Sequence, residues 1–177
     1  MNTKNNNWYV LTGGPCAGKT TTISELSKRG YPVVAEPARL IIEEKLTAGE
    51  TIDQIVTNEN WLPSVIERSL DLHTAAPDSE TVFFDRGIAD SIAYYRLNMR
   101  ELDQESKAMI DSVKYKKVFL LDLVDFQNDE ARSESIEEAR TLHILISDAY
   151  ESLGYEIVRV PVMPVSERVD YILARLH

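Results

Sequence analysis

A glycine-rich loop near the N-terminus constrains this chain more than any other segment. Residues 13–20 are Gly-Gly-Pro-Cys-Ala-Gly-Lys-Thr, which fit the pattern of Gly, any four residues, Gly, Lys and then Ser or Thr. The apolar residues 8–11 before it favour a strand, and the spacing of Ile23 and Leu26 after it favours a helix. An ordinary glycine turn is the alternative, but a chance match in a chain of this size has a probability of only about 1%.

The residue types of this loop suit a nucleotide phosphate. Its glycines let the backbone curl, so that successive N–H groups point inward at an anion. Lys19 can reach the β- and γ-phosphate oxygens, and the Thr20 hydroxyl can bind Mg²⁺. The helix expected to begin near Lys19 directs its positive end at the same anion. We therefore predict a site for ATP with Mg²⁺, or for GTP. Its predicted residues are Gly13, Gly14, Pro15, Cys16, Ala17, Gly18, Lys19, Thr20 and Thr21.

The length and the charge of the chain limit the functions that it can have. The 177 residues suffice for one domain, and 19 Lys and Arg against 29 Asp and Glu give a net charge of −10. An acidic chain without a basic block is a poor candidate for binding nucleic acid or an anionic membrane. Residues 1–7 are polar, so we expect a flexible end and no signal peptide. One cysteine, Cys16, suits a cytoplasmic location; it is either a redox sensor or a small variable loop residue.

Strand and helix patterns alternate along the whole chain. Alternation of this kind predicts an α/β fold, with a five-stranded parallel sheet covered by helices on both faces. Ligands of such sheets bind outside the carboxyl ends of the strands, where the loop already lies. Strands are predicted at 8–11, 31–35, 81–85, 117–121 and 156–160. Helices are predicted at 20–28, 37–45, 52–72 (one or two), 88–98, 102–113, 136–153 and 166–176, with Ser166 as the cap of the last.

Two charged residues follow the predicted strand at 81–84. Asp85 occupies the place where P-loop proteins hold Mg²⁺ with a second acid, so we predict that it binds the metal together with Thr20. A cap for the helix beginning near Ile88 is the alternative. Arg86 would point over the same strand ends, where it either binds a substrate oxyanion or pairs with a surface acid.

A second acid, Glu36, ends the strand at 31–35. A carboxylate there faces the space beyond the γ-phosphate and can accept a proton from an attacking hydroxyl or orient that hydroxyl. Arg39 lies one helical turn further on and can neutralise a substrate phosphate or carboxylate. Alternatively, Glu36 stabilises the dipole of the helix that follows and Arg39 is its (i, i+3) partner.

Residues 125–135 form a polar and charged connection before the long helix. Arg132 in this segment can stabilise charge on a transferred phosphoryl group if the segment closes over ATP as a lid. A solvated loop arginine is the alternative. We predict the catalytic set to be Lys19, Glu36, Asp85 and Arg132, with Glu36, Arg39 and Arg86 on the acceptor side.

Four further features have weaker functional interpretations. Residues 162–164 can pack on a nucleobase or form a plain apolar connection. His143 lies on the apolar stripe of its predicted helix, which favours core packing. Trp61 and the pair Tyr94-Tyr95 can stack on a substrate ring, although core packing is the default for aromatic side chains.

Several of these segments together resemble one family. It is the P-loop family of predicted ATPases and kinases related to the ribosylnicotinamide kinase domain, the NadR-like AAA-type ATPase domain. The resemblance implies a kinase-type fold with strand order 2-3-1-4-5. It also implies phosphate and Mg²⁺ roles for Lys19, Thr20 and Asp85, and an acceptor role for Glu36 and Arg39. The segments that carry it are 11–22, 34–39, 84–87, 154–158, 160–161 and 167–169.

Three function classes remain: a small-molecule kinase, a nucleotide-dependent switch and a mechanical ATPase. The chain is too short for the helical lid domain of ring ATPases, and it contains no Asn-Lys-x-Asp segment of the kind that reads guanine. A switch that only binds nucleotide would not need Glu36 and Arg39 beside the phosphates. We therefore expect a kinase that phosphorylates a nucleoside-like or other small metabolite.

Overall fold

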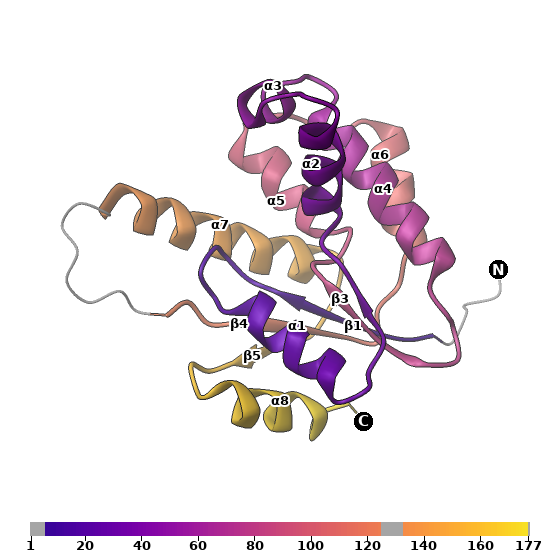
Figure 1. The fold of residues 1–177 in the computed structure, drawn as a ribbon, viewed down its shortest axis with the longest axis vertical. Coiled ribbons are helices and arrows are strands. Elements are labelled where there is room, and N and C mark those ends of the chain that lie inside the picture. The colour runs from indigo at the N-terminus through magenta and orange to yellow at the C-terminus, as the bar shows by residue number, and fades with distance from the viewer. Residues whose placement is uncertain (1–5, 125–132, 177) are drawn as a thin grey trace.

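A single parallel β-sheet forms the centre of the molecule (Figure 1). The computed structural model describes residues 6–124 and 133–176. The described strands are ordered β2-β3-β1-β4-β5, as the family resemblance implied. They are β1 (Asn7–Thr12), β2 (Val33–Val34), β3 (Thr81–Asp85), β4 (Lys117–Leu121) and β5 (Ile157–Val160).

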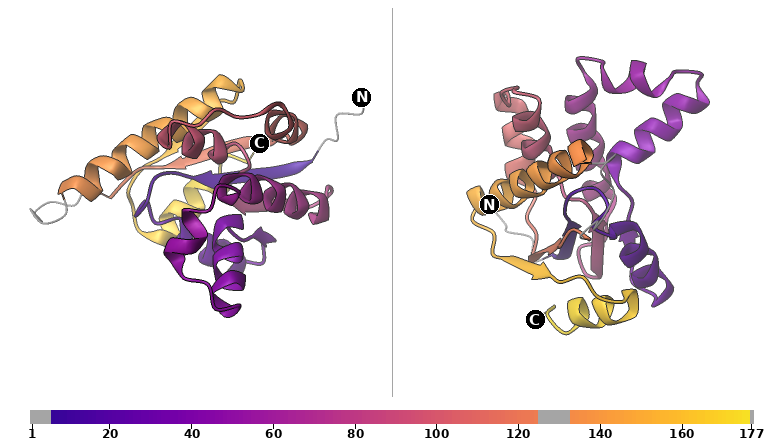
Figure 2. Two further views of the ribbon diagram at one scale, coloured as in Figure 1. Left: turned by 90° about the horizontal axis from the view of Figure 1, so that it is seen from above. Right: turned by 90° about the vertical axis from the view of Figure 1, so that its left-hand side faces the viewer.

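Helices cover both faces of this sheet (Figures 1 and 2). Helices α1 and α8 pack together on one face, and α4 to α7 lie on the other. The described helices are α1 (Lys19–Lys28), α2 (Pro37–Thr47), α3 (Ile52–Val56), α4 (Trp61–Ala75), α5 (Asp90–Leu97), α6 (Gln104–Ser112), α7 (Ser133–Ser152) and α8 (Val165–Leu173).

The central strands are buried on both sides because their residues alternate between two cores. In β1, Trp8 and Val10 belong to the core beneath α4 to α7, whereas Tyr9 and Leu11 belong to the core beneath α1 and α8. The register places Leu11 beside Asp85 of β3. The loop that follows β1 and the turn that follows β3 therefore emerge at the same edge of the sheet.

Several element boundaries differ from the predictions. Strand β2 is limited to two residues, although the Pro32 carbonyl still accepts a hydrogen bond from the Phe83 amide at 3.0 Å. The expected cap Ser166 is wrong: α8 begins at Val165 after Pro164, and the Ser166 hydroxyl instead accepts a hydrogen bond from Arg29 at 2.8 Å. Helix α5 begins at Asp90 rather than at residue 88, because the turn after β3 extends further than its apolar pattern indicated.

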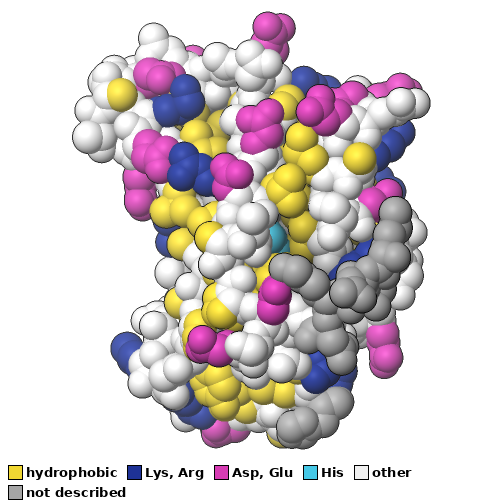
Figure 3. Space-filling model, turned by 90° about the vertical axis from the view of Figure 1, so that its right-hand side faces the viewer, with side chains coloured by type: hydrophobic (Ala, Val, Ile, Leu, Met, Phe, Trp, Pro, Cys, Tyr) yellow, Lys and Arg dark blue, Asp and Glu magenta, His cyan; other side chains and the backbone are white. Residues whose placement is uncertain are grey.

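Charges of both signs are mixed on the surface of the molecule. Among the described residues on the face drawn in Figure 3, Lys and Arg are interspersed with Asp and Glu instead of gathering in one patch. No helix in the described ranges is long and apolar enough to cross a membrane.

Candidate functional site

The phosphate loop connects β1 to α1 with little room for side chains. Gly13 and Gly18 adopt positive φ angles of 140° and 78°, which glycine adopts at low cost. A Cβ on Gly13 would lie 2.7 Å from the Leu121 carbonyl oxygen, so the loop backbone packs directly on the end of β4. Cys16 is exposed in this loop and has a positive φ of 62°. The backbone therefore curls at residues 13–18 as the motif predicts.

Lys19 lies buried at the start of α1. Its Nζ donates hydrogen bonds to the carbonyl oxygens of Gly13 at 2.9 Å and Gly14 at 2.8 Å. Burial, and after it the nearby charge of Arg86, lower the pKa of Lys19 to about 8, although Asp90 and other carboxylates oppose this shift. The ammonium group is thus held inside the loop, where a phosphate would exchange for the two carbonyls.

Asp85 ends β3 and is buried, with its Oδ1 lacking a hydrogen-bond partner among the described residues. Burial, followed by repulsion from Glu36, raises the pKa of this carboxyl, while Lys19 and the nearby arginines lower it. Asp85 does not cap α5, whose N-cap is Ala89. A buried polar atom without a partner is uncommon and requires an explanation, such as a ligand.

The oxygen donors at this position fit Mg²⁺. The described residues contain no group of three or more His, Cys, Asp and Glu that could hold a metal by themselves. Mg²⁺ is usually bound by one or two protein oxygens together with substrate phosphates and water. The unpartnered Oδ1 of Asp85 and the hydroxyl of the exposed Thr20 are oxygens of this kind.

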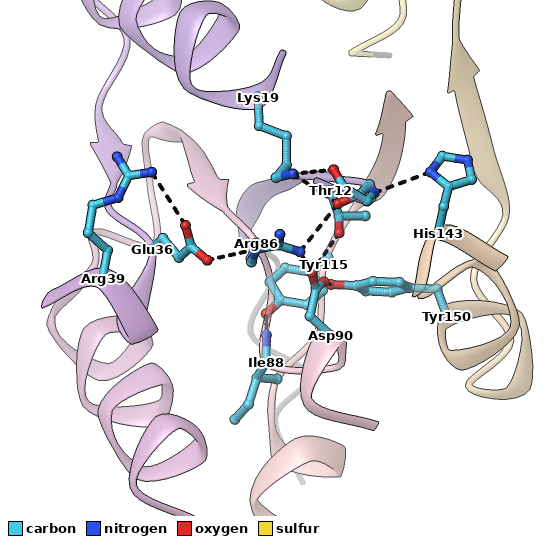
Figure 4. A network of polar contacts seen from close by, with 12 residues as sticks. Thr12, Lys19, Glu36, Arg39, Arg86, Ile88, Asp90, Tyr115, His143 and Tyr150 are labelled. Carbon is cyan, nitrogen blue, oxygen red and sulfur yellow. Dashed lines mark hydrogen bonds and ion pairs between the residues drawn. The ribbon is translucent and has the colours of Figure 1, made fainter. Parts of the chain in front are cut away.

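Glu36 lies between two guanidinium groups (Figure 4). Its Oε1 accepts a hydrogen bond from Arg86 Nε at 2.8 Å, and its Oε2 lies 3.6 Å from Arg39 Nη2. The same Arg39 nitrogen is 3.5 Å from the Thr20 hydroxyl of the phosphate loop. The structure thus brings the predicted acceptor residues to the loop, and it also contains the (i, i+3) ion pair that was the alternative for Arg39.

A buried network holds Arg86, whose φ of 67° lies in the left-handed region. Asp90 Oδ2 accepts hydrogen bonds from Arg86 Nη1 at 2.9 Å and from the Thr12 hydroxyl at 2.7 Å. Asp90 Oδ1 accepts one from the Tyr150 hydroxyl of α7 at 2.7 Å. Arg86 does pair with acids, but these are the half-buried Glu36 and the buried Asp90 and not surface acids, whereas its binding of a substrate oxyanion stays a prediction.

The turn after β3 rests on buried tyrosines. The Ile88 amide donates to the Tyr115 hydroxyl at 2.8 Å, and that hydroxyl contacts His73 Nε2 at 2.7 Å. A Cβ on Gly87 would lie 2.8 Å from the Tyr115 hydroxyl and closer still to that of Tyr150. Glycine at this position lets the turn sit directly on both hydroxyls.

A cavity of about 300 Å³ opens beside Glu36 and Arg86. Its polar end contains these two residues and Asp90, and Trp61 and Tyr94 are part of its otherwise largely apolar wall. Of the predicted aromatic candidates, Tyr95 belongs to the core, as the default supposed. Trp61 and Tyr94 pack against the same core and also line this cavity. A flat ring is the ligand shape that such a wall suits.

Sequence reasoning missed two residues that contact the loop. Arg168 of α8 is buried and donates from Nη1 to the Ala17 carbonyl at 3.2 Å. The expected core packing of His143 is wrong, because this half-buried side chain accepts a hydrogen bond from the Gly14 amide at 3.2 Å on Nδ1. Only the apolar stripe of α7 was visible in the sequence, and it does not reveal what the helix packs against.

Two predicted candidates remain without structural support. Arg132 lies outside the described residues, so its lid role stays a prediction. Residues 162–164 form the connection between β5 and α8, with Val162 exposed, and the Met163 carbonyl accepts a hydrogen bond from Arg168 at 3.4 Å. A contact of this connection with a nucleobase stays a prediction as well.

A family model described as an AAA domain matches residues 8–168. Among curated protein sequences, no significant match to the chain is found. The fold is similar to that of NadR solved with NAD and AMP-PNP, with a TM-score of 0.71 and 15% identity over 97% of this chain and 50% of that chain. The chain therefore spans about half the length of NadR.

Two smaller kinases match over nearly their whole length. Thymidylate kinase from Ehrlichia chaffeensis has a TM-score of 0.66 and 13% identity, covering 96% of this chain and 98% of its own. Shikimate kinase from Aquifex aeolicus has a TM-score of 0.57 and 21% identity, covering 96% and 95%. Together with the strand order, these similarities confirm the predicted P-loop fold of the kinase type.

Proposed function

We propose a phosphotransferase function for this chain, which belongs to the AAA domain family. Family membership and the fold similarity to NadR confirm the resemblance expected from the sequence. In our proposal the chain transfers the γ-phosphate of ATP to a hydroxyl or phosphate group of a small metabolite. The observation that carries it is the cavity lined by Glu36 and Arg86, since Arg86 Nη1 also donates to the Gly13 carbonyl of the loop at 3.3 Å. A protein that only binds nucleotide needs no such acceptor space.

The nucleotide occupies the loop in this proposal. Lys19 leaves its two carbonyl partners for the phosphate oxygens, and the loop amides hold the β-phosphate. Thr20 and Asp85 would hold Mg²⁺, which would supply positive charge beside the transferred phosphoryl group. The raised pKa of Asp85 supports this assignment, since a nearby cation would relieve the cost of keeping that carboxylate ionised.

The acceptor occupies the cavity. Glu36 accepts the proton of the attacking hydroxyl or orients it, and Arg86 and Arg39 offset the negative charge between acceptor and γ-phosphate. Trp61 and Tyr94 favour an acceptor with a flat ring, such as a nucleoside-like metabolite. Structures of similar fold include NadR in complex with NR and a deoxyadenosine kinase with bound dATP, so we place nucleosides among the acceptors to be tested.

Replacing Glu36 by Gln tests the acceptor role. The amide keeps the shape but removes the charge, so we expect turnover to fall about 10²–10⁴-fold, the usual contribution of a positioned base. The smaller end is expected because phosphoryl transfer depends mostly on positioning and electrostatics. The measurement is single-turnover transfer from ATP·Mg²⁺, with ATP affinity determined by calorimetry on the same variant.

The matched control is Glu43→Gln, which changes an exposed glutamate on α2, the helix that Glu36 directly precedes. This control should leave both transfer and ATP affinity unchanged. If Glu36→Gln transfers phosphate as fast as the parent, Glu36 has no catalytic role. If it instead loses ATP affinity while the control does not, Glu36 belongs to the nucleotide site and not to the acceptor site.

A further inference from the structure

Helix α7 packs directly on the first turn of the phosphate loop. A Cβ on Gly14 would lie 2.7 Å from the Ala139 carbonyl oxygen and 3.2 Å from the Cβ of His143. A Cβ on Gly13 would lie 3.6 Å from His143 Nδ1. The loop backbone and the helix therefore touch with no side chain between them, and a change at His143 is transmitted to the loop without an intermediary.

The hydrogen bond between these elements specifies the ionisation state of the imidazole. The Gly14 amide donates to His143 Nδ1 at 3.2 Å. Figure 4 draws a dashed line that ends on the His143 ring. A ring nitrogen accepts a hydrogen bond only when it carries no proton, so His143 is neutral with its proton on Nε2. Protonation of Nδ1 gives the ring a second N–H, which then faces the Gly14 N–H. Two donors cannot form a hydrogen bond with each other, so the contact is lost.

The charged groups around His143 favour its neutral form. Burial, then Arg159 of β5, lower the pKa of the imidazole, and Lys19 of α1 acts in the same direction. Asp122, which follows β4, opposes them. The net shift is downward from the ordinary value, so at neutral pH the ring is available as an acceptor.

Gly14 is held by side chains on both of its polar groups. Its N–H bonds to His143, and its carbonyl accepts from Lys19 Nζ at 2.8 Å. When Lys19 turns to a phosphate it gives up this carbonyl, and the bond to His143 is then the side-chain contact that keeps Gly14 in place. Loop amides bind phosphate only in a fixed geometry, so this contact affects nucleotide affinity.

We propose that His143 is a positioning residue of the nucleotide site, which holds the first turn of the phosphate loop against α7 in its neutral form and releases it on protonation. The inference rests on the proposed function, because it assumes that residues 13–21 bind the nucleotide. It adds a second requirement to the loop motif, namely an uncharged acceptor presented by a helix more than a hundred residues away in the chain.

Two substitutions separate the role of His143 as a hydrogen-bond acceptor from the effect of its protonation. His143→Asn places Oδ1 on the branch that carries Nδ1, so it can accept the same bond but does not titrate. His143→Leu keeps a branched side chain of similar reach without an acceptor. We expect Leu to weaken ATP·Mg²⁺ binding about fivefold at neutral pH, the value of one net hydrogen bond, and Asn to stay within about twofold of the parent.

The pH dependence provides the second readout. Calorimetric titrations of ATP·Mg²⁺ from about pH 8 to about pH 5 should show the parent losing about fivefold in affinity relative to Asn, with a midpoint below the ordinary histidine value. Protonation of ATP itself affects both proteins equally, so the ratio of their affinities isolates His143. Thermal unfolding of each variant at each pH establishes that the fold is intact.

Three results would overturn the proposal. The first is a Leu variant that binds as tightly as the parent at neutral pH. The second is a ratio of parent to Asn affinity that stays constant with pH. The third is a ratio that rises on acidification, because the imidazolium would then bind the phosphates directly. A folded parent that binds no nucleotide under any condition would contradict the nucleotide site itself and this inference with it.

Discussion

The buried aspartate at the start of α5 offers a sharp test of what positions Arg86. Asp90 and Arg86 have side-chain exposures of 4% and 10%, so their ion pair is shielded from water. In Asp90→Asn the remaining oxygen can still accept from Thr12 and Arg86, and the Tyr150 hydroxyl can turn to accept from the new amide group. The substitution thus removes the charge while keeping the packing.

The expected loss of stability follows from the burial of the pair. Removing one partner of a buried ion pair costs about 3–5 kcal/mol, because the other charge is left without compensation. The lower end applies here, since Arg86 keeps its contact with Glu36 at 2.8 Å. A loss of about 3 kcal/mol corresponds to a fall of about 6–12 °C in Tm for a chain of this size.

Urea denaturation followed by the fluorescence of Trp8 and Trp61 measures this loss. The matched control is Asp71→Asn, an exposed aspartate on α4, which should stay within about 0.5 kcal/mol of the parent. If Asp90→Asn unfolds at the same urea concentration as the parent, the buried network does not hold Arg86 in its left-handed conformation. A loss of stability in Asp90→Asn no larger than that in Asp71→Asn would lead to the same conclusion.

Two further predictions concern the phosphates and the metal. Lys19→Ala should weaken ATP·Mg²⁺ binding by about 1.5–3 kcal/mol, the value of a charge-assisted bond, and calorimetry showing parental affinity would contradict the loop assignment. Asp85→Asn should weaken ATP binding far more with Mg²⁺ than without it; equal losses would exclude a metal role. Because the pKa of Asp85 is raised in the folded protein, the ionised carboxylate lowers the free energy of unfolding at pH values above the ordinary pKa of an aspartate. This destabilisation disappears as the pH falls and the carboxyl is protonated. Asp85→Asn should therefore keep or raise the Tm at neutral pH.

The fold, and the edge of the sheet at which the candidate site lies, could be predicted from the sequence. The loop motif predicted a strand before it and a helix after it, and the alternation of strand and helix patterns predicted the parallel sheet. Asp85 and Glu36 were found because each follows a run of strand residues, and the ends of parallel strands meet at one edge. The structure accordingly brings Glu36, Arg86 and Arg39 together beside Thr20.

The missed residues contact the site through long-range bonds. His143 and Arg168 bond to loop residues 129 and 151 positions away, and Tyr150 bonds to Asp90 at a separation of 60. A periodic apolar pattern shows which face of a helix is buried, but it does not show which backbone group that face meets. For the same reason the pattern could not distinguish Trp61, which lines the cavity, from an aromatic residue of the core.

In the proposed function, this chain passes phosphate from ATP to a small acceptor bound in the cavity beside Glu36. The most direct measurement incubates the protein with ATP·Mg²⁺ labelled on the γ-phosphate and a panel of nucleosides, nucleotides and hydroxylated metabolites. We expect the label to move to one class of acceptor, and we expect Trp61→Ala to impair this transfer more than it impairs ATP binding. Tight binding of ATP or GTP with no labelled acceptor and negligible hydrolysis would contradict it and would identify a nucleotide-dependent switch instead.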